Sequence, residues 1–88
     1  MYAVVVKVTR NDVEKAEEGL RRDVVPRVSK APGFVAGYWT GAGSSGLSMI
    51  VFESEENARA AAEMIRDNAP PDTVTIDEVE VREVVASA

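Results

Sequence analysis

The stretch Leu47-Ser48-Met49-Ile50-Val51-Phe52 decides the fold, because it has the composition of a β-strand and is apolar at nearly every position. Successive side chains of a strand point to opposite faces of its sheet. One face therefore carries Ser48, Ile50 and Phe52. The other face carries Leu47, Met49 and Val51. A strand that is apolar on both faces predicts a sheet that is covered on both sides.

The opening segment, Tyr2 to Thr9, is a second strand with the same property over its first half. One side carries valine throughout, at Val4, Val6 and Val8. The other side is apolar at its start and polar at its end, in the order Ala3, Val5, Lys7 and Thr9. The two strands together predict a contiguous apolar patch on the face that no helix covers, which is more than a monomer usually exposes.

A helix follows the opening strand, because Asn11 or Asp12 can cap its first turn by accepting free amide hydrogens. Apolar residues recur every three or four positions and form one stripe, at Val13, Ala16, Leu20, Val24 and Val28. The carboxylates of the pair Glu17-Glu18 fall on the other side and are expected to be solvated. Pro26 is expected to kink or shorten this helix, and Pro32-Gly33 ends it.

The rest of the chain adds two strands, a helix and a final strand. Phe34 to Thr40 and Leu47 to Glu53 are joined by the glycine-rich hairpin 41–46. Ser54 caps a second helix with a small apolar face, Ala58, Ala61, Ala62 and Ile65, and the segment 68–72 ends it. In the last strand, 73–85, the apolar parity shifts from Val74 and Ile76 to Val79 and Val81. This shift predicts a bulge near Asp77-Glu78.

The resulting order is the ferredoxin-like βαββαβ plan of an α+β protein, a four-stranded antiparallel sheet with two helices on one face. Residues 1–88 are expected to form a single domain, since a chain of 88 residues has room for one hydrophobic core. The uncovered sheet face predicts a homodimer, with Leu47, Met49 and Val51 as interface candidates.

Composition narrows the classes of function. The formal net charge is −5, which disfavours binding to nucleic acid or an anionic membrane. The chain has no cysteine and no histidine, so disulfides, thiolate chemistry, haem ligation and most metal sites are disfavoured, and no cofactor and no metal are expected. The N-terminal apolar run is broken early by Lys7 and does not resemble a signal or membrane segment, which predicts a cytoplasmic protein.

Two motifs resemble nucleotide-binding signatures, and both have simpler explanations. The segment 41–46 matches G-x-G-x-x-G, but it joins antiparallel strands and opens no helix, so a plain hairpin is expected. The third strand resembles that of RNA-recognition domains, which share the βαββαβ order. Its surface positions, Leu47 and Met49, offer no aromatic ring on which a base can stack.

At this point the chain resembles the dimeric α/β-barrel superfamily, and within it the small proteins like antibiotic biosynthesis monooxygenases. The resemblance lies in the valine-rich first strand, the prolines that end the first helix, the passage Phe52-Glu53-Ser54-Glu55-Glu56 and the closing segment 79–85. It implies that two sheets face each other in a shared barrel and that ligand pockets lie between each sheet and its helices. It also implies cofactor-independent oxygenation of a small aromatic substrate. Haem degradation, known in other relatives, requires a histidine that this chain lacks.

The ligand-pocket candidates are Trp39, Tyr38 and Asn11. Alternation sends the two rings to opposite faces, so one of them can line a pocket, although packing in the core or the interface is the favoured explanation of each ring. Asn11, with Arg10 beside it, can orient a polar ligand group, although helix capping explains Asn11 as well.

Two functions remain open: a monooxygenase-like enzyme that acts on a small aromatic substrate, and a non-catalytic dimeric module that binds a small apolar or aromatic ligand or regulates a partner. The enzyme requires a cavity of at least about 300 Å³ between sheet and helices. A core filled by Leu20, Val24 and Phe34 would leave no such cavity.

Overall fold

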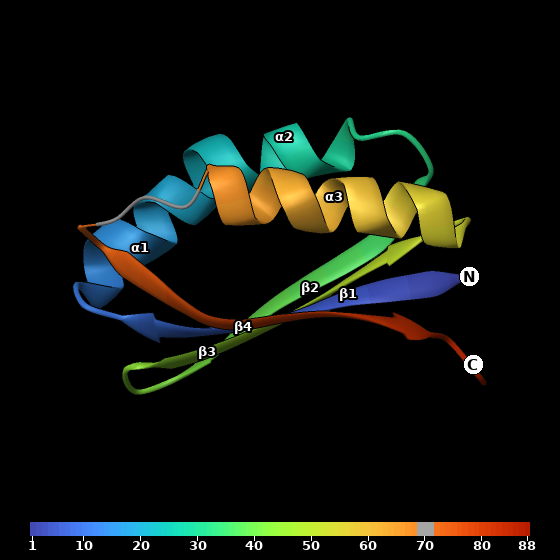
Figure 1. Cartoon of the computed structure of the whole chain (residues 1–88). Coiled ribbons are helices and arrows are strands. Elements are labelled where there is room, and N and C mark those ends of the chain that lie inside the picture. Colours follow the sequence, from blue (N-terminus) through green and yellow to red (C-terminus); the bar gives the residue numbers. More distant parts are fainter. Residues whose placement is uncertain (69–71) are drawn as a thin grey trace.

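The antiparallel strand pairs of the chain build one sheet, in the spatial order β2-β3-β1-β4. The computed structural model describes residues 1–68 and 72–88. Its elements are β1 (Tyr2–Arg10), α1 (Val13–Gly19), the π-helical turn η1 (Leu20–Val24), α2 (Val25–Ser29), β2 (Phe34–Ala42), β3 (Ser45–Phe52), α3 (Glu55–Asp67) and β4 (Val74–Glu83). In the described residues, all helical segments lie over one face of the sheet, and none lies over the other face (Figure 1). The predicted ferredoxin-like βαββαβ plan is confirmed.

The strand register separates the two faces of the sheet as the alternation predicts. Ile50 pairs with Val4 of β1 and with Gly37 of β2, and its side chain is 1% exposed beneath the helices. Met49 pairs with Val5 and Tyr38 on the opposite face. Ile50 and Val4 belong to the hydrophobic core, whose fully buried side chains also include Phe52 and Val28.

The predicted bulge in the last strand is present. Lys7 of β1 pairs with Glu78, whereas Val8 pairs with Ile76, so Asp77 is the extra residue of β4. Its carboxylate accepts a hydrogen bond of 2.8 Å from the Thr9 hydroxyl. Because one residue is inserted, the apolar residues on both sides of it pack against the same core.

The helix before Pro26 contains a wider turn and is not shortened. The amide of Val25 donates to the carbonyl of Leu20, five residues earlier, which is the π-helical spacing. A proline in a regular helix would collide with the carbonyl four residues before it, here that of Arg22. The π turn accommodates this proline, and the helical path continues to Ser29.

Both helix starts follow local capping rules. Asp12, the second of the two predicted candidates, caps α1 by accepting from the amide of Lys15 at 3.1 Å. Ser54 caps α3 by accepting from the amide of Asn57 at 3.2 Å. The small residues of α3 are buried as predicted, namely Ala58, Ala61 and Ala62. The predicted helix-ending segment falls partly on residues 69–71, which lie outside the described residues.

The hairpin between β2 and β3 is tighter than predicted. The sequence predicts a loop over 41–46, but the strands extend through Ala42 and from Ser45, which leaves a turn of Gly43 and Ser44. Gly43 has a φ of 59°, which glycine adopts without steric cost. The flanking glycines therefore belong to the strands and leave space on the sheet surface for other side chains.

Candidate functional site

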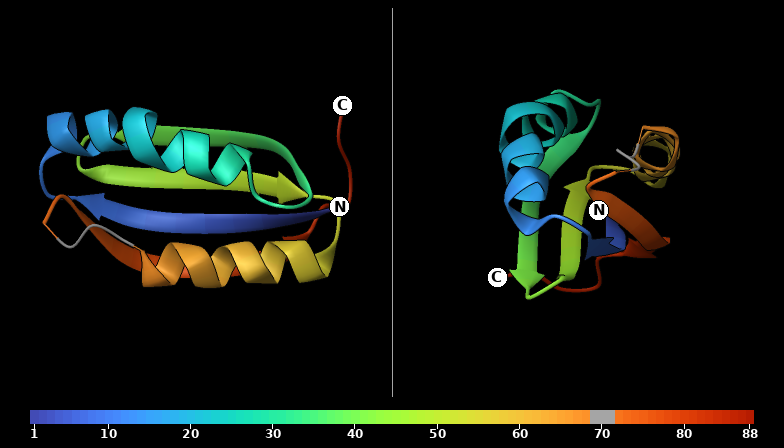
Figure 2. Two further views of the ribbon diagram at one scale, coloured as in Figure 1. Left: turned by 90° about the horizontal axis from the view of Figure 1, so that it is seen from above. Right: turned by 90° about the vertical axis from the view of Figure 1, so that its left-hand side faces the viewer.

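A cavity of about 660 Å³ lies between the helices and the covered face of the sheet. The segment α1 to α2 runs over the β2–β3 side and α3 over the β1–β4 side (Figure 2). Side chains from both of these helical segments and from all four strands line the cavity between helices and sheet. The apolar part of this lining is Val6, Val8, Ala16, Leu20, Val24, Val25, Val28, Trp39, Ile50, Met64, Ile65, Val74 and Ile76.

The residues expected to fill this space in a closed core do not fill it. Leu20 and Val24, on the π-helical turn, form part of the cavity wall. Phe34 is not part of the lining, and its ring packs edge to face against Phe52 with the ring centroids 6.2 Å apart. The volume exceeds the roughly 300 Å³ that a small-molecule site requires.

Of the three predicted pocket residues, one lines the cavity. Trp39 faces the helices, and its indole lies so close over Gly37 that a Cβ atom there would come within 2.7 Å of the ring. Tyr38 lies on the uncovered face and is 67% exposed. Asn11 is exposed, does not belong to the lining, and donates from its side-chain amide to the hydroxyl of Thr75 at 3.2 Å. The structure therefore separates Trp39 from Tyr38 and Asn11.

The predicted interface residues lie together on the uncovered face. Leu47 is 44% exposed, Met49 is 47% exposed, and Val51 is partly exposed. Tyr38 is the register partner of Met49 and adds its ring to this group. We call these four residues the open-face patch.

A charged stripe lies along β4, which β1 separates from the strands of the open-face patch. Lys7 and Glu78 form an ion pair of 3.3 Å, and Arg82 and Glu80 form one of 2.6 Å. The pKa of Glu80 lies below its ordinary value because of a side-chain hydrogen bond shared with Glu78 and the hydrogen bond that Arg82 donates. The same contact with Glu80 raises the pKa of Arg82.

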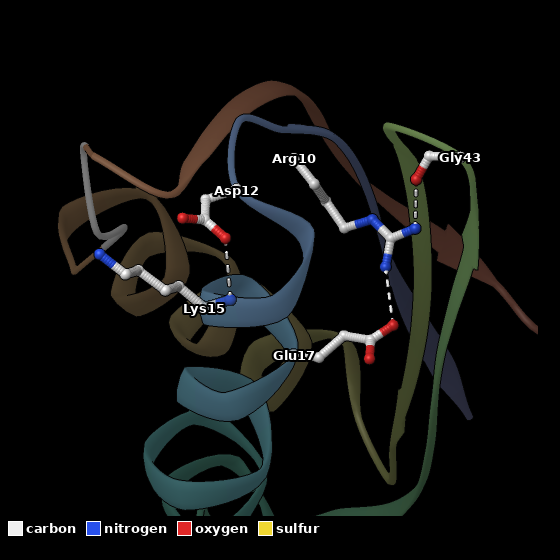
Figure 3. A network of polar contacts seen from close by, with 5 residues as sticks. All are labelled: Arg10, Asp12, Lys15, Glu17 and Gly43. Carbon is white, nitrogen blue, oxygen red and sulfur yellow. Dashed lines mark hydrogen bonds and ion pairs between the residues drawn. The ribbon is translucent and has the colours of Figure 1, made fainter.

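Arg10 is the most buried charged side chain of the cavity wall, with 12% of it exposed. Its Nη1 donates to Oε1 of Glu17 at 3.2 Å, and its Nη2 donates to the carbonyl oxygen of Gly43 (Figure 3). The guanidinium thus joins the end of β1 to α1 and to the β2–β3 hairpin. Glu17 therefore differs from its neighbour Glu18, which pairs with Arg22 on the helix surface as expected of a solvated carboxylate.

Glycine makes room for Arg10 on the sheet. A Cβ atom at Gly41 would come within 2.6 Å of three guanidinium atoms, Cζ, Nη1 and Nη2. At Gly46 it would come within 2.6 Å of Val8. The glycine-rich segment therefore supports the side chains at the end of the cavity. In the sequence, Arg10 stands next to the predicted pocket residue Asn11. No local pattern indicated that Glu17 would contact Arg10.

Two further properties concern the described residues. In the ranges 1–68 and 72–88, no group of three or more acidic side chains is placed to hold a metal ion. Among the helices described, none is long and apolar enough to cross a membrane.

Comparisons with known proteins agree with the fold. No protein-family model matches the chain, and a search of curated proteins finds no match. Among solved structures, the chain is similar to a dimeric ferredoxin-like protein from an uncultured marine organism, with a TM-score of 0.66 and 13% identity. The match covers 100% of this chain and 98% of the other. At this identity the likeness establishes the ferredoxin-like fold alone.

Proposed function

We propose that the protein is a homodimeric module that binds a small apolar molecule in the cavity of each subunit. The observation that carries this proposal is the cavity of about 660 Å³ with walls of Leu, Ile, Val and Trp side chains. Small-molecule sites have this form, a mainly apolar hollow with a few polar groups at defined positions. Among the polar residues of the lining, Arg10 and Glu17 form an ion pair of 3.2 Å.

The homodimer is proposed from the open-face patch. Tyr38, Leu47 and Met49 expose large apolar or aromatic surfaces side by side, whereas Ile50 and Phe52 on the other face of β3 are buried. Burying such a patch against an identical patch removes apolar area from water twice over. The solved structure that shares this fold is described as dimeric, which supports the same arrangement here.

Binding is favoured over catalysis because the charged groups at the cavity end are engaged with each other. Arg10 and Glu17 form an ion pair, so Glu17 is not free to act as a general base. Tyr38 and Asn11 lie outside the cavity and do not converge with Trp39 on one ligand.

A monooxygenase-like enzyme that needs no cofactor is the second candidate. The position of Trp39 in an apolar cavity favours it, because such an enzyme supplies shape and dryness to an electron-rich aromatic substrate that itself reduces oxygen. Oxygen uptake with a hydroquinone separates the two candidates. Uptake that depends on protein and is lost when the cavity is filled supports the enzyme. Binding without uptake supports the module.

The primary test uses the aromatic hydrocarbon tetralin as probe and the fluorescence of Trp39, the single tryptophan of the chain, as readout. We expect a saturable change in emission with the wild-type protein. The variant Val24→Phe extends a ring into the cavity and should weaken binding at least about tenfold. Val35→Phe is the matched control, because it adds the same atoms at an exposed position. If tetralin gives no saturable signal with the wild type, the proposed site is not a site.

A further inference from the structure

Ser48 interrupts the apolar side chains on the covered face of β3. Alternation places it on the same face as Ile50 and Phe52, and its register partners are Val6 of β1 and Trp39 of β2. Ser48, both of its register partners and Ile50 line the cavity. The floor that the sheet gives to the cavity therefore carries a short hydroxyl side chain between the apolar side chains of both neighbouring strands.

The hydroxyl of Ser48 is accessible from the cavity. Within the ranges 1–68 and 72–88 it forms no side-chain hydrogen bond, and the serine and threonine hydroxyls that do are those of Thr9, Ser29, Thr40, Ser54 and Thr75. In the same ranges, Arg10 Nε is the one side-chain polar atom that is both buried from solvent and unpaired. Since Ser48 is partly exposed and its oxygen is unpaired without being buried, the oxygen is open to a ligand on the covered face.

The neighbours of Ser48 do not complete its hydrogen bonding. The side chains of Val6 and Ile50 have neither donor nor acceptor, and the indole of Trp39 has a donor only. A hydroxyl on an apolar wall loses free energy unless a hydrogen bond compensates for lost water. A ligand group that replaces water at this oxygen therefore has to supply a hydrogen bond. A charged group is disfavoured there, because the apolar floor does not solvate it.

We propose that Ser48 is the polar contact of the ligand in this cavity, and that the ligand brings an uncharged carbonyl or hydroxyl group to it. This assignment rests on the proposed function, and it adds the residue that selects the ligand. The remainder of the ligand is apolar, since Val6 and Ile50 flank Ser48 on the sheet and Leu20 and Val24 form the helical wall. A serine hydroxyl donates to a carbonyl and both donates to and accepts from a hydroxyl, so it fits either group.

The test measures how much affinity each of three probes loses when the hydroxyl of Ser48 is removed. Tetralin has no polar group, α-tetralone adds a carbonyl to the same rings, and tetrahydronaphthol adds a hydroxyl. Calorimetry gives their affinities for the wild-type protein and for Ser48→Ala. We expect the variant to bind one or both of the polar probes about fivefold more weakly and to bind tetralin equally well, because it loses one neutral hydrogen bond and keeps the apolar walls.

Two controls accompany this comparison. Ser45→Ala removes the same hydroxyl from an exposed position of the same strand, and it should leave all three affinities unchanged. Tetralin carboxylate brings a charge to the cavity and should bind to the wild-type protein more weakly than tetralin. Tighter binding of this probe would overturn the restriction to uncharged groups. Circular dichroism shows whether each variant is folded.

The infrared spectrum of the bound probe distinguishes a carbonyl from a hydroxyl contact. If Ser48 donates to the carbonyl of α-tetralone, the carbonyl band should lie at lower frequency in the wild-type protein than in Ser48→Ala. An unchanged band together with weaker binding of tetrahydronaphthol assigns a hydroxyl group. If both polar probes keep their affinities in Ser48→Ala, the cavity binds ligands but the assignment of Ser48 is wrong. If no probe binds to the wild-type protein, the proposed function itself fails.

Discussion

The two faces of β3 carry side chains of similar hydrophobicity but have different surroundings. Ile50 and Phe52 are buried beneath the helices, whereas Leu47 and Met49 on the other face are about half exposed. Hydrophobic character alone therefore does not distinguish the faces. What differs is the partner: on one side it belongs to the same chain, and on the other we propose a second copy.

The two faces of the sheet have different roles. The covered face provides the folding core at one end and the cavity at the other, near Arg10 and Trp39. None of the helices described in 1–68 and 72–88 covers the open face, on which we propose that a second copy packs. Substitutions on the two faces should consequently affect different measurable quantities, the stability of the chain and the stability of the dimer.

The largest expected effect concerns the covered face. Phe52→Ala removes a fully buried ring and should lower the free energy of unfolding by about 3–5 kcal/mol, by lost burial and the cavity left behind. Urea unfolding measures the loss, which should be similar at every protein concentration. Met49→Ala is the control on the open face, and its effect should grow with protein concentration. Equal, concentration-independent losses would remove the distinction between the faces.

The next effect concerns the open face. Met49→Asp places an unpaired charge in the proposed interface and should weaken the dimer about 100-fold, or ~2.7 kcal/mol. Light scattering after size-exclusion chromatography should change from twice the chain mass of 9.5 kDa toward that mass itself. Ala60→Asp introduces the same carboxylate at an exposed position of α3 and should leave the measured mass unchanged. A wild-type protein that is monomeric at micromolar concentration would refute the proposed homodimer.

A smaller effect tests the support of Arg10 on the covered face. Gly41→Ala brings a Cβ atom against the guanidinium, which must move at the end of its flexible side chain and lose its contacts with Glu17 and Gly43, so the free energy of unfolding should fall by about 1 kcal/mol. Gly19→Ala is the matched control, because nothing lies within 4 Å of its Cβ position and its backbone is helical. It should be stabilising by about 0.5–1 kcal/mol. Thermal unfolding of the two variants should therefore shift in opposite directions.

The smallest effect belongs to the charged stripe along β4. The folded state lowers the pKa of Glu80, so its contribution to stability is present above the ordinary pKa of a glutamate and is lost as the pH falls through the lowered value. Glu80→Gln should therefore show a slightly smaller drop in melting temperature than the wild type between neutral and acidic pH. A larger drop in the variant would contradict the direction of the pKa change.

Much of the fold follows from short-range patterns in the sequence. The parity shift in the last strand predicts the bulge at Asp77, and Asp12 and Ser54 are capping residues at the starts of their helices. Alternation along β3 separates Ile50 from Met49. These features are predictable because each depends on residues a few positions apart, whose geometry is fixed by the strand or helix period.

The tertiary structure alone decided the candidate site. The sequence left open which aromatic of β2 faces the helices, and it predicted a kink or an early end where the π turn before Pro26 forms. The contact of Arg10 with Glu17 and Gly43 joins three separate elements. The cavity and these contacts of Arg10 depend on how the helices lie across the sheet. Many side chains that are distant in the sequence set that arrangement together. By itself the apolar strand 47–52 predicts a partner for both faces of the sheet, and the packing determined which face holds the cavity.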